Sequence, residues 1–485
     1  MLRDFLRDLV VEELGLPPTD DQRAAAEALA DFVLCEQGLA VLLLRGFAGT
    51  GKTSLVSAFV RTMDRLERPC FLLAPTGRAA KVFAQFSGRS AFTIHKCIYR
   101  QRSLEMDADF SLNYNGRRQV LFIVDEASMV SDASDSGSER ESLLDDLLRF
   151  VYGGQHGCRL LLVGDDAQLP PVGEAVSPAL QEGVLRAKGL DVHTATLRQV
   201  VRQAESSGIL FNATRLRTLV ERGEADALPR IRFSGFADVK VVPGDELIET
   251  LSECYGRDGM DDTRVVCRSN RRCVAYNNGI RVQILGREDP LCAGEEVMVA
   301  KNNYHWADLA ALAAKENGDP MDGIPDFLAN GDMAVVEHLR NVRELYGFRF
   351  ADCTLSLPDY DGVQMDCTVL LDTLFAEAPA LSHDQQQLLY ERVMEDYADL
   401  PSKRDRLKAV RQDRYYNAVQ IKYAYAVTCH KAQGGQWGNI FIDQGYLTED
   451  MLDVGYLRWL YTAITRATRR VFFVNWRPEQ VDDTQ

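Results

Sequence analysis

The stretch AVLLLRGFAGTGKTSL, residues 40–55, decides how the first part of this chain folds. Its leading apolar run is typical of a buried strand, and Gly46-x-x-x-x-Gly51-Lys52-Thr53 follows at once. Glycines at this spacing let backbone N–H groups turn inward around phosphates, and the next helix offers its positive end. We expect Lys52 to reach the β- and γ-phosphates and the Thr53 hydroxyl to ligate Mg²⁺. The stretch therefore predicts a site for MgATP, although kinases, GTPases, transporters and motors all share such a loop.

Strand-like apolar runs alternate with helical patterns on either side of this loop. Short continuous runs separated by helices indicate a parallel sheet buried on both faces. The first set of runs lies at 40–44, 70–74, 120–125 and 159–165, and a second set lies at 264–269, 423–429, 439–443 and 470–475. Between the sets, strands are expected around a turn at 353–371, and a helix is expected after Ser382, where Ser382-x-x-Gln385 is a possible capping box. The sequence predicts an α/β fold with an insertion in its second half.

Two acids end the run IVDEAS, residues 123–128. Asp125 is expected to hold Mg²⁺, and Glu126 is placed to orient or deprotonate the attacking water. The alternative is a pair of exposed acids at a strand end.

A third strand end, VGDDAQLPPVG at 163–173, carries Asp165 and Gln168. Because a parallel sheet binds ligands at strand carboxyl ends, both side chains should point toward the γ-phosphate. Gln22 follows Thr19 and could read adenine, although Thr19-Asp20 is equally a helix N-cap. The residues assigned to the nucleotide are Gln22, Gly46, Gly49, Thr50, Gly51, Lys52, Thr53 and Ser54.

Composition narrows the function classes. The 485 residues are 46% hydrophobic and 26% charged, which suits a globular protein of several domains. No apolar run approaches the about 20 residues that span a bilayer, so no membrane role is expected. The 11 scattered cysteines form no C-x-x-C pair and indicate free thiols in a reducing cytoplasm. A net charge of −16 argues against general coating of nucleic acid, but an acid-free basic stretch between Glu67 and Glu105 leaves room for a narrow groove.

The motifs, in this order, resemble those of a superfamily 1 helicase, and more narrowly the RecD and Dda group, which translocates 5′ to 3′ on single-stranded DNA. The third and fifth motifs, GDDAQLPP and HKAQGG, favour this group over the 3′-to-5′ relatives. The further matching segments are APTGRAAKV at 74–82, TIHK at 93–96, LRQVVRQAESSGI at 197–209, CRSNRRCVAYNNGIR at 267–281, AVTCHKAQGGQW at 426–437 and YTAITRAT at 461–468.

The resemblance implies two RecA-like parallel-sheet motor domains in tandem, with ATP between them. Arg202 and Arg466 would then act as cationic fingers on the transferring phosphoryl group. With Lys52, Glu126 and Gln168 they complete the expected catalytic set. The expected DNA contacts are Thr76, Arg78, His95 and Lys96 in the first domain and Thr428, His430 and Lys431 in the second. For His95 and His430, the alternative is a structural role in which the imidazole is hydrogen-bonded within the core.

The resemblance also sets expected domain limits. The first motor domain comprises 1–99 and 119–190, and the second comprises 191–295 and 414–485. Residues 100–118, with the turn signal Asn115-Gly116, are read as a short hairpin that separates strands, or else as a plain surface hairpin. Residues 296–413 are read as an accessory insertion with SH3-like strands and a helical segment.

The expected function is an ATP-dependent 5′-to-3′ DNA helicase that uses Mg²⁺, binds single-stranded DNA and forked or tailed duplexes, and acts as a monomer in the cytoplasm. Protein partners in repair, recombination or replication are expected. Two alternatives stay open: an RNA or RNA–DNA helicase of the same superfamily, and an ATP-dependent nucleic-acid clamp or remodeller that does not unwind.

Overall fold

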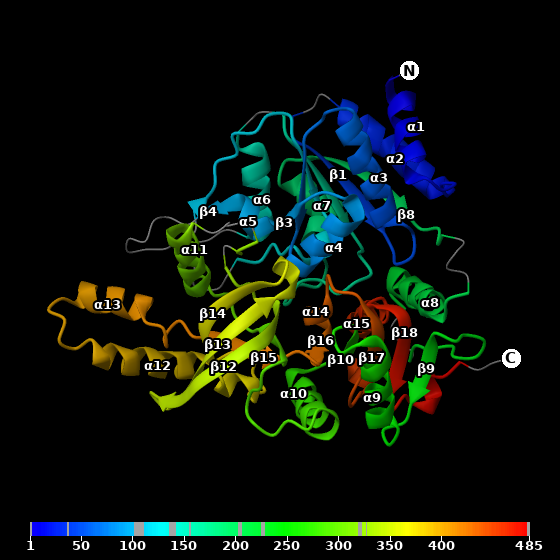
Figure 1. Ribbon diagram of the computed structural model, residues 1–485. Helices are drawn as coiled ribbons and strands as arrows, with labels where there is room; N and C mark the ends of the chain where they lie inside the picture. Colours follow the sequence, from blue (N-terminus) through cyan, green and yellow to red (C-terminus); the bar gives the residue numbers. More distant parts are fainter. Residues whose placement is uncertain are drawn as a thin grey trace. The chain divides into compact units, whose positions relative to one another are not determined.

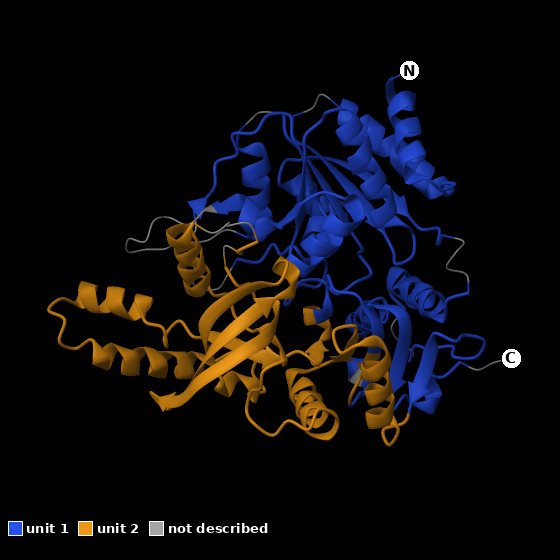
Figure 2. Ribbon diagram, in the orientation of Figure 1, with its two compact units in different colours: residues 1–242, 432–440, 446–485 blue, residues 243–431, 441–445 orange. Residues whose placement is uncertain are grey.

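The computed structural model describes residues 2–35, 38–100, 111–134, 142–154, 157–201, 206–224, 228–318, 323–325 and 327–482. The chain forms two compact units (Figure 2). The first unit comprises Met1–Val242, Ala432–Ile440 and Tyr446–Gln485, and the second comprises Pro243–Lys431 and Phe441–Gly445.

The first unit contains a six-stranded parallel sheet with the order β3-β2-β6-β7-β1-β8 (Figure 1). The predicted runs at 40–44, 70–74, 120–125 and 159–165 form β1, β2, β6 and β7. The strands are β1 Ala40–Gly46, β2 Cys70–Ala74, β3 Ala91–Thr93, β6 Leu121–Val124, β7 Arg159–Gly164 and β8 Asp191–Leu197. The predicted boundary at 190 is wrong, because β8 pairs with β1 in this sheet, with Leu44 opposite Ala195.

Both faces of this sheet are covered, as its continuous apolar strands require. Successive side chains of a strand point to opposite faces, so Leu42 packs with one core cluster and Leu43 with another. The first cluster draws on α1, α2 and α3, and the second on α6 and α7 (Figure 1). The helices are α1 Leu2–Leu14, α2 Asp20–Leu34, α3 Lys52–Arg65, α4 Gly77–Ser87, α5 Ile94–Ile98, α6 Leu143–Tyr152 and α7 Glu182–Ala187.

The turn predicted at Asn115-Gly116 is wrong. The short antiparallel pair is β4 Tyr99–Arg100 with β5 Ser111–Leu112, so the chain between these strands, residues 101–110, lies outside the described residues. Asn115 comes after β5 and has no positive φ, which a hairpin turn of that type requires. Its side chain is 3% exposed and donates to the Val151 carbonyl at 3.4 Å. Asn115 therefore has a structural role as a buried hydrogen-bond donor and does not form a turn.

A second, five-stranded sheet has the order β16-β10-β17-β18-β9. The pairs β10–β16 and β9–β18 are parallel. The strands are β9 Val239–Val242, β10 Thr263–Cys267, β16 Ala426–Thr428, β17 Trp437–Asp443 and β18 Ala467–Val474. The associated helices are α8 Gly208–Arg222, α9 Leu247–Asp258, α10 Asn270–Gly279, α14 Cys429–Ala432 and α15 Val454–Ile464, with a π-helical turn at Ile280–Ile284. Two parallel sheets confirm the predicted α/β class with tandem RecA-like domains.

The insertion in the second half contains a closed five-stranded barrel, in line with the predicted SH3-like strands. Its strands are β11 Glu296–Val299, β12 Met333–Leu345, β13 Phe348–Leu357, β14 Val363–Leu370 and β15 Val419–Tyr423. The predicted end of the insertion at 413 is wrong, because β15 closes the barrel against β11 and β14. The predicted strand at 423–429 is therefore divided between β15 and β16.

Three helices accompany the barrel, namely α11 His305–Asn317, α12 His383–Asp396 and α13 Lys403–Gln412. The capping box of α12 forms as predicted between Ser382 and Gln385. Leu389, Val393 and Val410 of α12 and α13 are buried in one cluster with Phe348 and Phe350 of β13. This apolar contact holds the helical pair on the barrel.

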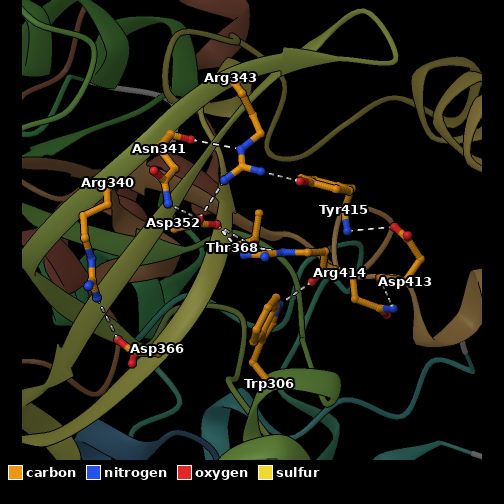
Figure 3. Close-up of polar contacts among 11 residues, drawn as sticks. Trp306, Arg340, Asn341, Arg343, Asp352, Asp366, Thr368, Asp413, Arg414 and Tyr415 are labelled. Carbon is orange, nitrogen blue, oxygen red and sulfur yellow. Dashed lines mark hydrogen bonds and ion pairs between the residues drawn. The ribbon is translucent and has the colours of Figure 1, made fainter.

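A polar network also ties the end of the helical pair to the barrel (Figure 3). Asp352 of β13 accepts hydrogen bonds from Asn341 at 3.0 Å and from Arg343 at 2.9 Å. Arg414, just after α13, donates to the same carboxylate and to the Thr368 hydroxyl of β14, the latter at 3.0 Å from Nε. Two guanidinium groups on one carboxylate fix where the chain re-enters the barrel.

Short 3₁₀ helices complete the described structure, at Ala127–Met129, Pro178–Leu180, Pro358–Tyr360, Asp372–Leu374, Glu449–Met451 and Pro478–Gln480. Within the described residues, no helix has both the length and the apolar character needed to traverse a bilayer. All eleven cysteines lie in the described part of the chain, and each is a free thiol.

Candidate active site

The loop between β1 and α3, residues 46–53, will be called the P-loop. Its glycines are required by their surroundings: a Cβ at Gly46 would lie 2.7 Å from Lys52 Cγ, and one at Gly51 would lie 2.5 Å from Gln22 Nε2. Gly49 and Gly51 have φ of +75° and +77°, a region that favours glycine. The P-loop therefore has the tight backbone that the sequence pattern predicts.

The polar side chains of the P-loop are held by its own backbone. Lys52 Nζ donates to the Phe47 carbonyl at 3.0 Å, and the buried Thr50 hydroxyl donates to the same carbonyl at 2.8 Å. Thr53 is half-buried and Ser54 is exposed in the first turn of α3. These placements leave the Lys52 ammonium and the start of α3 beside the loop in which phosphates are predicted to bind.

Gln22 completes the capping box of α2, whose N-cap is Thr19, and it also contacts the P-loop. Its side chain accepts from the Thr19 N–H at 3.0 Å, and the Thr19 hydroxyl accepts from the Gln22 N–H at 3.2 Å. Gln22 Nε2 also donates to the Thr50 carbonyl at 3.2 Å. The N-cap alternative is therefore present in the structure, and a contact with adenine stays a prediction.

Asp125 and Glu126 follow the carboxyl end of β6. Asp125 accepts from the Glu126 N–H at 2.9 Å. Burial, and then the charge of Glu126, raise the pKa of Asp125 to about 7, while Lys52 opposes this shift. Glu126 has a φ of 51°, which is uncommon for a residue with a side chain and is often found at functional sites.

Asp165, at the end of β7, is 1% exposed and has three polar neighbours. Its carboxylate accepts from the Ala167 N–H at 3.0 Å and from the Tyr461 hydroxyl at 2.5 Å, and it lies 3.9 Å from Lys52 Nζ. Burial raises the pKa of Asp165, and Lys52 and Tyr461 oppose that effect. The Tyr461 hydroxyl also accepts from the Ala48 N–H of the P-loop at 2.9 Å. One hydroxyl group of α15 thus connects the P-loop to the acid that follows β7.

Gln168 is 4% exposed, and its Oε1 has no hydrogen-bond partner among the described residues. The loop that carries it is fixed by other groups. Leu169 donates its N–H to the Thr462 hydroxyl at 2.9 Å, Gln433 Nε2 donates to the Leu169 carbonyl at 2.7 Å, and Arg458 donates to the Gln168 carbonyl at 3.1 Å. A buried, unpaired acceptor on a fixed loop is suited to a donor supplied by a ligand or a water molecule.

Arg466 follows α15 and lies beside Glu126, with 3.9 Å between Nη1 and Oε1. Its guanidinium is 3% exposed and donates to the carbonyls of Thr462 at 3.1 Å and Gly435 at 3.3 Å. Arg202 lies outside the described residues. The residue before it, Val201, donates its N–H to the Gly49 carbonyl at 3.0 Å.

Mg²⁺ fits the donor set at this edge of the sheet. Thr53 and Asp125 offer the oxygen ligands that this cation prefers. A divalent cation bound there would add positive charge beside the buried Asp125 and the neighbouring Glu126.

The DNA-contact residues predicted in the first unit lie near α4 and α5. The Thr76 hydroxyl caps α4 by accepting from the Ala79 N–H at 3.2 Å. Arg78 donates to the Gln436 carbonyl at 3.0 Å, and its guanidinium lies 4.1 Å from the Trp437 ring centroid. His95 is half-buried against Tyr99, with ring centroids 5.5 Å apart, and Lys96 is exposed.

The DNA-contact residues predicted in the second unit surround the start of α14. Thr428 and Lys431 are half-buried and His430 is exposed. Lys431 donates to the side chain of Asn330, in a loop that also contains the buried Asp332. Burial lowers the pKa of Lys431 to about 8, although Asp332 opposes this. Sequence reasoning missed Asn330 and Asp332, because nothing in their local pattern distinguishes them from other loop residues.

Sequence reasoning also missed Arg458, Tyr461 and Thr462, although the last two lie in the matched segment YTAITRAT. The spacing of these residues with Arg466 is that of one helix face, i, i+3, i+4 and i+8. That periodicity was the available signal that the whole face of α15 meets the nucleotide site.

Two family models match parts of this chain. A family model described as an AAA domain matches residues 18–228, and a model of the UvrD-like helicase C-terminal domain matches residues 423–474. An ATP-dependent RecD2 DNA helicase from Deinococcus radiodurans is 26% identical over 96% of this chain and 53% of its own length. An ATP-dependent DNA helicase Pif1 from Bdellovibrio bacteriovorus is 31% identical over 33% of this chain and 35% of its own.

Among solved structures, Pif1 helicase from Bacteroides in complex with ADP-AlF3 and ssDNA aligns over 97% of this chain and 95% of its own, with a TM-score of 0.46 and 16% identity. The chain spans about half the length of the Deinococcus relative, 53%, and about a third of the Bdellovibrio relative, 35%.

The two matched models and the P-loop define the class: the chain has the P-loop of an AAA-type nucleotide-binding domain, followed by a segment similar to the UvrD-like helicase C-terminal domain. Among helicases, the chain is similar to a RecD2 helicase and, over a third of its length, to a Pif1 helicase, which is the group that the sequence motifs resemble.

Proposed function

We propose that this chain is an ATP-dependent DNA helicase that moves 5′ to 3′ on single-stranded DNA and separates the strands of a duplex. The observation that carries the proposal is that one face of α15 contacts the P-loop and also the acids that follow β6 and β7. Tyr461 bonds to Ala48 and Asp165, and Arg466 lies 3.9 Å from Glu126. The RecD2 DNA helicase that resembles the chain supports DNA as the substrate.

In the proposed reaction the P-loop N–H groups and Lys52 bind the phosphates of ATP. Gln168 and Glu126 orient the attacking water, and a Glu126 carboxylate oxygen accepts its proton as the phosphoryl group is transferred. Arg466, with Arg202, stabilises the charge that develops on that group. Thr53 and Asp125 would hold Mg²⁺, which neutralises phosphate charge when bound.

The proposed motor step depends on α15. When Lys52 engages phosphate instead of the Phe47 carbonyl, the hydrogen bonds of Tyr461 and the position of Arg466 must adjust. ATP thereby shifts the population between two arrangements that grip DNA differently. The gripping residues are Thr76, Arg78, His95 and Lys96 in one set and Thr428, His430 and Lys431 in the other. Contacts of this kind with phosphates are independent of base sequence.

The proposal extends to the location, oligomeric state, partners and substrates of the protein. We place the chain in the cytoplasm, associated with the nucleoid when bound to DNA, as a monomer with partners in repair, recombination or replication. The proposed substrates are single-stranded DNA and forked or tailed duplexes.

A strand-separation assay tests this proposal against its two rivals. A labelled DNA duplex with a single-stranded tail should be separated only with hydrolysable ATP, and a matched RNA duplex should not. Separation of RNA alone would favour the RNA helicase. DNA-stimulated ATP hydrolysis without any strand separation would favour a clamp or remodeller.

A further inference from the structure

Three arginines gather at the edge of the first sheet opposite the P-loop. Arg159 is the first residue of β7, and Arg68 and Arg118 come just before β2 and β6. These three strands are adjacent and parallel, with Leu121 opposite both Cys70 and Arg159. Their starting points therefore lie side by side, although the arginines are far apart in sequence.

The chain enters each of these strands through a left-handed residue. Glu67 and Gln119 have φ of 53° and 54°, and Gly157 has φ of 70°. Residues with side chains rarely adopt this conformation, and those that do are frequent at ligand-binding positions. Each of the three arginines lies within two residues of one of these positions, and all three line one opening.

That opening is a cavity of about 630 Å³. It will be called the arginine cavity, and its charged and polar walls come from Glu67, Arg68, Arg118, Gln119 and Arg159. The remaining wall is apolar and includes Val33, Leu34 and Met63 at the ends of α2 and α3. Its volume lies within the range of sites for small molecules, about 300–1,000 Å³.

The three arginines of the arginine cavity form no ion pair within the described residues, although the Glu67 carboxylate lines the same cavity. Within the described residues, the guanidinium groups of Arg68 and Arg118 make no hydrogen bond or ion pair, and Arg159 makes no ion pair. The Nε of Arg159 is buried without a hydrogen-bond partner. Burial lowers the pKa of Arg159, and the charge of Arg68 lowers it further. Arg68 and Arg118 are exposed and Arg159 is half-buried, so the cavity wall presents three guanidinium groups to a ligand from solution, beside the Glu67 carboxylate.

Helix capping accounts for one arginine and not for the group. Arg159 Nη1 donates to the Val33 carbonyl in the last turn of α2, at 2.7 Å, which offsets the negative end of that helix. The equivalent position at the end of α3 is already occupied by Arg65, which pairs with Glu12 and Glu13. Arg68 and Arg118 have no such role.

We propose that the arginine cavity is a second anion site, which binds a phosphate-bearing ligand of up to nucleotide size. Guanidinium groups recognise phosphate through paired N–H donors, and the apolar wall can accept a ring or sugar face. The site lies at the strand starts, whereas the P-loop, Asp125 and Asp165 lie at the strand ends. Binding there is therefore independent of the proposed helicase reaction.

Calorimetric titration of Lys52→Ala protein, which has a weakened P-loop, tests the proposal with pyrophosphate and, separately, with AMP. We expect saturable binding of at least one ligand. Arg118→Gln and Arg159→Gln, each in the same background, should weaken that binding about tenfold, the effect of losing one charge-assisted hydrogen bond. Tighter binding of AMP would identify a nucleoside phosphate, and tighter binding of pyrophosphate a smaller phosphate.

The matched control is Arg230→Gln, which removes an exposed arginine of the same unit away from the cavity. It should leave binding unchanged. Arg118 is exposed and without a partner, so Arg118→Gln keeps the test valid even if Arg159→Gln fails to fold. No saturable binding at millimolar ligand, or binding insensitive to both variants, would overturn the proposal while leaving the helicase reading intact.

Discussion

The two edges of the first sheet differ in how their charged side chains are paired. At the strand ends, Asp165 has three polar neighbours, and each is a named contact from the P-loop, its own loop or α15. At the strand starts, Arg68 and Arg118 have no partner within the described residues. The charges of the first edge are joined by hydrogen bonds and one ion pair, whereas the arginines of the second edge form no ion pair within the described residues. The two edges therefore differ in how their charged groups are paired, and we propose catalysis at the first and ligand binding at the second.

The largest expected effect is at the strand ends. Arg466→Ala should lower kcat for ATP hydrolysis by about 10³-fold or more, because an arginine that stabilises a transferring phosphoryl group contributes about 10³–10⁵. Steady-state hydrolysis with saturating DNA measures this. Arg470→Ala is the matched control, because it removes a half-buried arginine of β18 that donates to Asn439 on the neighbouring strand β17. Turnover near the wild-type value in Arg466→Ala would make Arg466 a structural residue.

Glu126→Gln should reduce turnover by about 10²–10⁴-fold, the range for loss of a general base. The amide keeps the size of the side chain but cannot accept the proton. Binding of ATP and of single-stranded DNA, measured by fluorescence titration, should stay close to wild type. Substantial residual hydrolysis would remove Glu126 from the mechanism.

Tyr461→Phe tests whether the network at the strand ends is coupled to nucleotide binding. The change removes one donor from Asp165 and leaves the Ala48 N–H unpaired. Lys52 should then be drawn more strongly to Asp165, and we expect the KM for ATP to rise about tenfold, with a smaller fall in kcat.

Tyr456→Phe is the control for Tyr461→Phe, because it removes a buried hydroxyl of the same helix that accepts from Gln480 at 3.0 Å. It should affect stability without changing the KM. Equal changes in KM for the two variants would mean that Tyr461 only supports the fold.

The smallest expected effect is at the strand starts. Arg118→Gln should leave the free energy of unfolding within about 0.5 kcal/mol of wild type, because the exposed guanidinium has no contact to lose. In the Lys52→Ala background, added pyrophosphate should raise the thermal midpoint, and the further change Arg118→Gln should reduce that rise. A clear loss of stability without ligand would show that Arg118 is a structural residue.

The candidate site at the strand ends could be predicted from the sequence, because its residues lie in short, contiguous motifs. The glycine-rich loop predicts the positions of Lys52 and Thr53, and the apolar runs predict that Asp125 and Asp165 lie at strand ends. Tyr461 was less accessible, because its role depends on the approach of α15 to the P-loop. The buried Gln22 amide shows the same limit, since one residue serves both as a cap and as a contact to Thr50.

The arginine cavity at the strand starts could not be predicted from the sequence. Arg68, Arg118 and Arg159 become neighbours only through the strand order of the sheet. The turn assigned to Asn115-Gly116 failed for a related reason. A local signal for a turn was overridden by burial of the Asn115 amide against Val151. The division of 423–429 between a barrel strand and a sheet strand likewise follows from pairing partners distant in sequence.

The measurement that tests the central claim most directly compares unwinding of two DNA duplexes that differ only in the polarity of their single-stranded tail. With ATP and Mg²⁺, we expect the duplex with the 5′ tail to be separated and the duplex with the 3′ tail to stay intact. The Glu126→Gln protein should separate neither. Preference for the 3′ tail would contradict the proposed direction, and separation of neither duplex by wild-type protein would contradict the helicase function itself.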